Sequence, residues 1–125
     1  MGTGYKGNSP YFRSVEQNIL PTASKFEYND GWFGKKGKSG NARIRNIEAD
    51  DNFAAAKAFY DAIAYGGKEE IIDGNMSITN MADGTIITFR AVSHSDGKPA
   101  VDINIKPSTH TGGLKGQKIH FVKGS

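Results

Sequence analysis

In the C-terminal part of this chain the apolar residues recur at every second position, and that period constrains the fold more than any other feature. The segments "VDINIK" (101–106) and "QKIHFVK" (117–123) alternate strictly between apolar and polar side chains, as half-buried strands do. Before them, "MSITNMADGTIITFRA" (76–91) carries the dipeptide Asp83-Gly84, which is typical of the tight turn of a β-hairpin. The pattern predicts an antiparallel sheet of about four strands.

The N-terminal part of the chain has helical spacing instead. In "DDNFAAAKAFYDAIAYGG" (50–67) an aspartate cap precedes several alanines, and a glycine ends the run. Its apolar stripe consists of Phe53, Ala56, Tyr60 and Ile63. A second helix is expected within 8–20 and ends at Pro21, followed by a loop over 22–40 and a short strand at 42–49. We therefore predict an α+β fold, with N-terminal helices packed on a roughly four-stranded antiparallel sheet.

The composition fits one soluble globular domain that spans residues 1–125, in which 1–41 form a less regularly patterned helical and loop part. Cysteine is absent, so disulfides, thiol chemistry and cysteine-ligated zinc are excluded. No apolar run approaches the roughly 20 residues that span a bilayer, so we expect no membrane contact. The net charge of +3 is compatible with a polyanionic partner.

Alternate side chains of a strand point to opposite faces, so the pattern assigns each residue of the sheet to a core face or a polar face. The core face is expected to receive Ile78, Ile87, Phe89, Val101, Ile103, Ile105, Ile119 and Phe121. The polar face is expected to receive Ser77, Thr79, Thr88, Arg90, Asp102, Asn104, Lys106, Lys118 and His120. In the simplest registers, neighbours about 5 Å apart form one row of Thr79, Thr88, Asn104 and His120.

The polar face combines the residue types that cleave RNA without a metal. The ribose 2′-OH must lose a proton as it attacks phosphorus, and histidine exchanges protons near neutral pH because its ordinary pKa is about 6.5. His120 is therefore the candidate acid or base, and Arg90 and Lys118 would stabilise charge on the phosphoryl oxygens. Asn104 or the hydroxyl of Thr88 would orient the imidazole or the nucleophile.

Simpler readings of the same residues stay open. His120 alone is also compatible with an ordinary exposed histidine on a strand. Arg90 is also compatible with a structural ion pair to Asp102 across two strands, an interaction of small energetic value.

A basic stretch, "GKKGKSGNARIR" (34–45), contains no acid. Its cations, together with one from the later strand, are the candidate RNA-binding residues: Lys35, Lys36, Lys38, Arg43, Arg45 and Lys106. Trp32 and Phe33 precede the stretch, and an aromatic ring there could stack on an unpaired base. The alternatives are a solvated loop for the cations and a small core for the aromatic residues.

The segment "DGTIITFRAVSHSDGKPAVDINI…LKGQKIHFVK", with "AKAFYDAIAYGG" before it, resembles the C-terminal toxin domains of bacterial polymorphic toxins, such as LXG-type and contact-dependent inhibition effectors. The resemblance covers roughly residues 42–123. Its motifs fall on Arg90, Ser93, Ser95, Asp96, Gly97, Val101 to Asn104, and Lys118 to Phe121. It adds Ser93 and Ser95 to the candidate catalytic residues, although both are also ordinary turn formers.

The resemblance implies a fold of the barnase/EndoU/colicin/RelE type and an antibacterial endoribonuclease, with RNA, and tRNA in particular, as substrate. It further implies secretion within a larger effector, action in the cytoplasm of the target bacterium, and a cognate immunity protein. We expect that protein to be acidic, because the polar face is cationic. We expect no cofactor and no metal, since the three histidines lack ligand spacing. A non-catalytic RNA-binding module, a DNase toxin and a structural piece of a secreted protein remain the alternatives.

Overall fold

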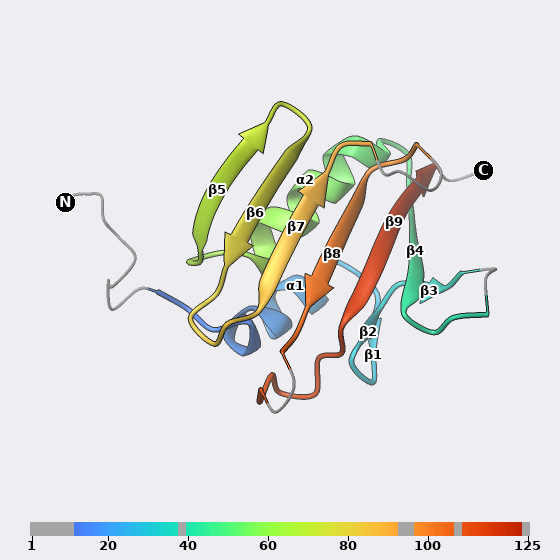
Figure 1. Cartoon of the computed structure of the whole chain (residues 1–125). Coiled ribbons are helices and arrows are strands. Elements are labelled where there is room, and N and C mark those ends of the chain that lie inside the picture. Colours follow the sequence, from blue (N-terminus) through green and yellow to red (C-terminus); the bar gives the residue numbers. More distant parts are fainter. Residues whose placement is uncertain (1–11, 38–39, 93–96, 107–108, 124–125) are drawn as a thin grey trace.

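The computed structural model describes residues 12–37, 40–92, 97–106 and 109–123 (Figure 1). Its helical elements are the 3-10 helix η1 (Val15–Asn18), α1 (Ile19–Ala23) and α2 (Asn52–Ile63). A two-stranded ribbon pairs β1 (Tyr28–Asn29) with β2 (Trp32–Phe33). The main sheet has seven strands, in the order β3 (Lys35–Lys36), β4 (Ile44–Ala49), β9 (Gln117–Lys123), β8 (Ala100–Asn104), β7 (Ile86–Arg90), β6 (Met76–Asn80) and β5 (Lys68–Asp73).

The predicted arrangement of helices on a roughly four-stranded antiparallel sheet is wrong. The four expected strands are present as β6 to β9, but β3, β4 and β5 extend the sheet to seven strands, and β4 runs parallel to β9. The strand β5 was missed because its sequence, "KEEIID", lacks the alternation of apolar and polar residues. Most of the described helix and strand residues therefore belong to a mixed sheet, and α1 and α2 are short.

The N-terminal helix is shorter than predicted and does not end at Pro21. Asn18 precedes the first residue of α1, which places Pro21 in the first turn of that helix. The amides of a first turn have no intrahelical partner, so proline costs no hydrogen bond there. The expected beginning of this helix, at residues 8–11, lies outside the described residues.

The second predicted helix is confirmed as α2. The side chain of Asp51 caps it by accepting a hydrogen bond from the amide of Ala54 at 3.0 Å. Its buried face consists of Ala56, Phe59, Tyr60 and Ile63. Phe53 is half exposed, and its ring meets the edge of Phe89 at a centroid distance of 5.9 Å.

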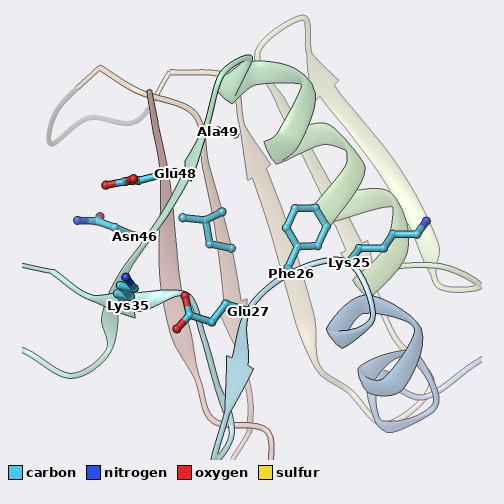
Figure 2. A pocket seen from close by; sticks show the side chains of 8 residues that line it. Lys25, Phe26, Glu27, Lys35, Asn46, Glu48 and Ala49 are labelled. Carbon is cyan, nitrogen blue, oxygen red and sulfur yellow. The ribbon is translucent and has the colours of Figure 1, made fainter. Parts of the chain in front are cut away.

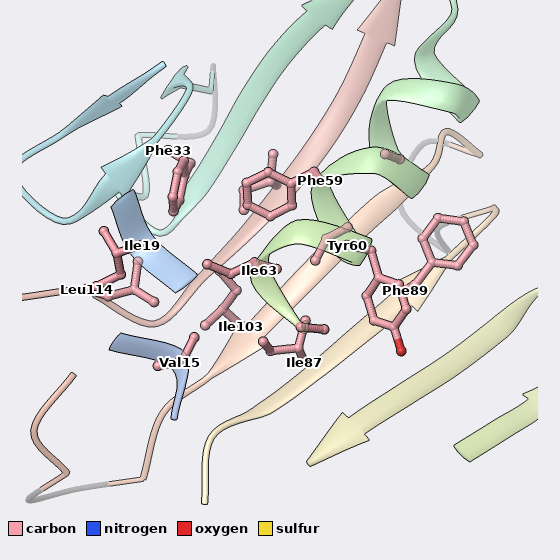
Figure 3. Close-up of a cluster of buried hydrophobic side chains, with 14 of the residues drawn as sticks. Val15, Ile19, Phe33, Phe59, Tyr60, Ile63, Ile87, Phe89, Ile103 and Leu114 are labelled. Carbon is pink, nitrogen blue, oxygen red and sulfur yellow. The ribbon is translucent and has the colours of Figure 1, made fainter. Parts of the chain in front are cut away.

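The core lies between the helices and one face of the sheet (Figure 3). Phe59 of α2 is at its centre, and its ring contacts those of Phe26, Phe33 and Phe121 at centroid distances of 5.3, 4.9 and 5.6 Å. The predicted core face is confirmed for Ile87, Phe89, Val101, Ile103, Ile119 and Phe121, and Ile105 packs partly buried against them.

The faces predicted for the side chains of β6 are wrong. The residue expected on the core face lies on the opposite face, and those expected on the polar face lie on the core face. Thr79 is buried on the helix side, where its hydroxyl hydrogen-bonds the phenol of Tyr60. Ile78 pairs with Thr88 on the opposite face, and Ser77 pairs with the core residue Phe89. A buried hydroxyl costs little when it is hydrogen-bonded, so Tyr60 allows a threonine to take the place expected for an isoleucine.

The helices cover one face of the sheet. Helix α2 packs on β4, β7, β8 and β9, and Figure 1 shows α1 and α2 on the same side of the strands. We call the opposite side, which carries Thr88, Arg90, Asp102 and Lys118, the open face. None of the described helices has the length and apolar character needed to cross a membrane.

Candidate functional site

Two neighbouring rows of side chains cross the open face. The first row contains Lys35, Asn46, His120, Ala100, Arg90 and Met76, in that order from the β3 margin. The second row contains Ile44, Lys118, Asp102, Thr88 and Ile78. We call the six polar residues in the middle of these rows the cross-sheet cluster: Asn46, His120, Arg90, Lys118, Asp102 and Thr88.

His120 and Arg90 lie on either side of Ala100 in the first row. Adjacent strands are about 4.8 Å apart, so the Cα atoms of His120 and Arg90 are about 10 Å apart. Ala100, between them, is only 1% exposed, so the space above its methyl group is not open to solvent. The sequence placed both residues on this face, and the structure places them in one row.

His120 is more buried than a strand position on an uncovered face would suggest. Its exposed fraction is 6%, and its Nδ1 atom is buried. Pro99 and Ala100, beside it, are buried as well, and the carbonyl of Pro99 accepts a hydrogen bond from the amide of Phe121 at 2.9 Å. The imidazole therefore lies in a buried environment, next to the residues with which β8 begins.

Arg90 is half-buried, and its guanidinium keeps donors available. Among the described residues its hydrogen bond goes from Nη1 to the thioether of Met76, at 3.7 Å. Sulfur is a weak acceptor, and a guanidinium has five N–H donors. Within the described part of the chain no ion pair joins Arg90 to Asp102, which faces Thr88 and Lys118 instead.

Lys118 lies in the second row, two residues before His120 on β9. The same strand face carries both, so their Cα atoms are about 6.6 Å apart. Lys118 is half-buried and is directly opposite Asp102, while Thr88 is opposite Asp102 from the other side. A carboxylate between a lysine and a hydroxyl can orient both by accepting hydrogen bonds.

Two predicted residues lie away from the row of His120. Asn104 is opposite Ile86, four residues along β8 from Ala100, so it is about 13 Å from the row of His120. The predicted row that joined Asn104 and His120 is therefore wrong. Lys106 lies over the β6–β7 turn, since a side chain added at Gly84 would meet its Cδ atom at 3.6 Å.

The basic stretch divides into exposed and structural residues. Lys35, Lys36 and Arg43 are exposed, and Lys35 continues the first row beyond Asn46. Arg45 points to the helix side, where it donates to the carbonyls of Phe33 and Gly34 at 3.1 and 2.9 Å. Burial lowers the pKa of the Arg45 guanidinium, which lies 5.2 Å from the ring centre of Trp32. Its donors hold the β2–β3 connection, so we leave it out of the candidate RNA site.

Several predicted residues lie outside the described residues, namely Lys38, Ser93 and Ser95 among the candidates, and Asp96 in the same motif. Sequence reasoning also missed Asn46, which the parallel pairing of β4 and β9 places next to His120. The period of two in residues 42–49 marks a strand but does not identify its partner, so the sequence offered no signal for this contact.

A groove of about 410 Å³ lies next to the Lys35 end of the first row (Figure 2). It is lined by Lys25, Phe26, Glu27, Lys35, Asn46, Ile47, Glu48 and Ala49. The strand β3 pairs only with Arg45 and Asn46, so the following residues of β4 border the groove at the margin of the sheet. Its lysines and glutamates are mixed, so it shows no preference for a charged ligand.

Within the described part of the chain, no three histidine or acidic side chains gather as a metal site requires. Comparison of the chain with protein-family models, with curated proteins and with solved structures returns no match. The argument for function therefore depends on the chemistry of the cross-sheet cluster.

Proposed function

We propose that this chain is the endoribonuclease domain of an antibacterial toxin, and that it cleaves tRNA without a metal. The observation that supports this most is the first row, where His120 and Arg90 are separated only by Ala100 on a face that no helix covers. A phosphodiester bound between the side chains of His120 and Arg90 would contact a proton-transfer group on one side and a cation on the other.

His120 would act as the general base that accepts the proton of the 2′-OH nucleophile. The ribose 2′-oxygen forms a bond to phosphorus as the bond from phosphorus to the 5′-oxygen breaks, and the imidazole takes the 2′-OH proton. The departing 5′-oxygen takes a proton from solvent. The products are a 2′,3′-cyclic phosphate and a 5′-hydroxyl.

Arg90 and Lys118 would stabilise the charge that develops on the phosphoryl oxygens. Fixed donors that are aimed at this charge are worth more than the same groups in water, because they need no reorganisation during the reaction. Arg90 suits the task, since a guanidinium matches a phosphoryl group with two parallel N–H bonds. Asp102 is opposite Lys118, although no ion pair joins the two within the described residues, and Asn46 would position His120 or the 2′-OH.

The direction of the rows suggests how RNA would lie. They cross the strands, from Arg90 through His120 and Asn46 to Lys35 at the margin of the sheet. Five strands at about 4.8 Å each cover about 19 Å between the first and last Cα atoms, enough for a short stretch of single-stranded backbone. A loop of tRNA fits such a track better than a duplex does, because its phosphates can follow the sheet surface.

A toxin of this kind requires a neutralising partner in the producing cell. The open face carries Arg90, Lys118 and, at its margin, Lys35, so a protein that masks it should present aspartate or glutamate. We expect the product of a neighbouring gene to bind with a salt-sensitive rate and to protect the amides of β8 and β9 from hydrogen exchange. Protection confined to α2 would show that the partner blocks RNA from the helix side instead.

A second function is supported by the burial of His120. An imidazole with an exposed fraction of 6% is also what a structural histidine shows, and the cations of the open face would then bind RNA without cleaving it.

The two functions are distinguished by incubating the purified domain with total tRNA, with and without EDTA, and separating the products on a gel. Ribonuclease activity predicts cleavage in both conditions, and His120→Ala should abolish it while the protein remains folded. Arg90→Ala should slow the single-turnover rate by about 100-fold or more.

Asn104→Ala is the matched control, because it removes a polar side chain from the same face of the sheet, about 13 Å along β8 from the row of His120. It should leave the cleavage rate nearly unchanged. Intact tRNA together with tight binding would favour the non-catalytic module. Cleavage that EDTA abolishes would contradict the metal-free mechanism, and a folded His120→Ala protein that cuts normally would remove His120 from it.

A further inference from the structure

The strand β5 forms the second margin of the seven-stranded sheet, and it is longer than β3, the other described strand whose residues are all exposed. All six of its residues are exposed, and it pairs with β6 alone. Its two isoleucines, Ile71 and Ile72, are 70% and 46% exposed. An edge strand has unpaired amides and carbonyls, and apolar side chains on such an edge favour pairing with another strand.

The features that usually protect a sheet edge from further pairing, such as bulges and lysines, are weakly developed in β5. A register shift between Ile71 and Asp73 interrupts the pairing with β6 late in the strand, after four consecutive paired residues. Lys68 is the one lysine of β5, whereas Glu69, Glu70 and Asp73 are acidic. The strand is therefore negatively charged within a chain whose net charge is +3.

The charges argue against a second copy of this chain as the occupant. Two copies of β5 that pair antiparallel about a two-fold axis place residues of the same face opposite each other. A register centred on Glu70 opposes Glu70 to itself, and one centred on Ile71 opposes Glu69 to Asp73. Parallel pairing in register opposes each acid to its copy. Like charges directly opposite each other destabilise strand pairs.

We propose that β5 is the docking edge for a strand of another protein, with lysine or arginine opposite Glu69 and Glu70 and with apolar residues opposite Ile71 and Ile72. The added strand would extend the sheet beyond β5, and its main-chain hydrogen bonds would supply affinity while the charges select the partner. This edge lies three strands from the β8 position of Ala100, so the docking does not depend on the proposed RNA cleavage.

The test uses an acetylated peptide amide, Thr-Lys-Val-Ile-Lys-Lys-Thr, carrying a fluorophore, titrated against the full chain. Paired antiparallel, its Lys-Lys lies opposite Glu70 and Glu69 and its Val-Ile lies opposite Ile72 and Ile71. We expect binding that protects the amides of β5 from hydrogen exchange and leaves β8 and β9 unchanged. The same peptide with alternate N-methylated residues cannot form the main-chain bonds of an added strand and should give no protection. A peptide with glutamate in place of lysine should bind at least about 10-fold more weakly.

Glu70→Lys should weaken the peptide complex by at least about five-fold, because it removes an attraction and adds a repulsion. Glu48→Lys is the matched control, since Glu48 is an exposed acid on β4, near the other margin, and its reversal should leave binding unchanged. Equal binding of the acidic and basic peptides, or protection outside β5, would overturn the proposal. Dimerisation of the free chain, seen by light scattering and lost in Glu70→Lys, would identify a second copy as the occupant and overturn it as well.

Discussion

Gln117, at the start of β9, joins the β1–β2 ribbon to the main sheet by two buried hydrogen bonds, and a third, partly buried bond goes to Lys115. Its Oε1 accepts from the amide of Phe33 at 2.7 Å, and its Nε2 donates to the carbonyls of Gly31 and Lys115 at 2.9 and 2.7 Å. Gln117→Met keeps the length of the side chain and removes all three bonds. We expect this substitution to destabilise the domain and to loosen the strand that carries Lys118 and His120.

The magnitude depends on which groups lose their partner. Phe33 is fully buried, so its amide would stay unsatisfied at a cost of about 1–3 kcal/mol. The carbonyl of Gly31 keeps a bond from the amide of Lys115, at 3.1 Å, and Lys115 is exposed to water. The lost bonds from Gln117 to the carbonyls of Gly31 and Lys115 therefore add only about 1 kcal/mol together. The total loss in the free energy of unfolding is then about 2–4 kcal/mol.

Urea unfolding followed by tryptophan fluorescence measures this loss, since Trp32 lies in the ribbon that Gln117 holds. With an m value of about 1.5 kcal/mol/M, the midpoint should fall by about 1.5–2.5 M. Gln17→Met is the control, because Gln17 makes its side-chain bonds at the surface and its loss should cost less than about 1 kcal/mol. If Gln117→Met lowered the free energy of unfolding by no more than Gln17→Met does, the proposed role of Gln117 in joining the ribbon to the sheet would be refuted.

Three further predictions concern the core, the pH dependence and the RNA track. Phe59→Ala removes the ring at the centre of the core and should cost about 3–5 kcal/mol in urea unfolding, whereas a loss below about 1.5 kcal/mol would show that the core repacks. Burial raises the pKa of Tyr60, so the unfolded chain releases that proton first, and wild-type stability should fall as pH rises above about 10. Tyr60→Phe should lose less stability than wild type over this range, and parallel curves would contradict the assignment. Lys35→Ala should lower RNA affinity and reduce the slope of log K against log salt by about one, and an unchanged slope would place RNA elsewhere.

The elements that sequence patterns identified are those in which local signals agree. Asp51 caps α2, the Asp83-Gly84 turn joins β6 to β7, and β9 has the predicted bounds, Gln117–Lys123. In each case the capping residue, the turn dipeptide or the period of two acts over a few neighbouring positions. These signals also placed Arg90, Lys118 and His120 on one face, which the structure confirms.

The features that sequence patterns missed depend on contacts between distant segments. The parallel pairing of β4 with β9 joins Asn46 to His120 across more than 70 residues of chain, and a local period carries no information about such a partner. The faces of β6 depend on a hydrogen bond between Tyr60, a helix residue, and Thr79. The expected neighbour of His120, Asn104, lies in another row because the β8–β9 register pairs His120 with Ala100 instead.

The most direct test of the proposed chemistry uses a tRNA-derived oligonucleotide whose scissile nucleotide carries hydrogen in place of the 2′-OH. The proposed attack by the 2′-oxygen predicts that wild-type protein cuts the unmodified strand to a 2′,3′-cyclic phosphate and cuts the modified strand at least about 100-fold more slowly. His120→Ala should be equally slow on both strands, since it lacks the group that takes the 2′-OH proton. Cleavage of the modified strand at the wild-type rate would contradict the account.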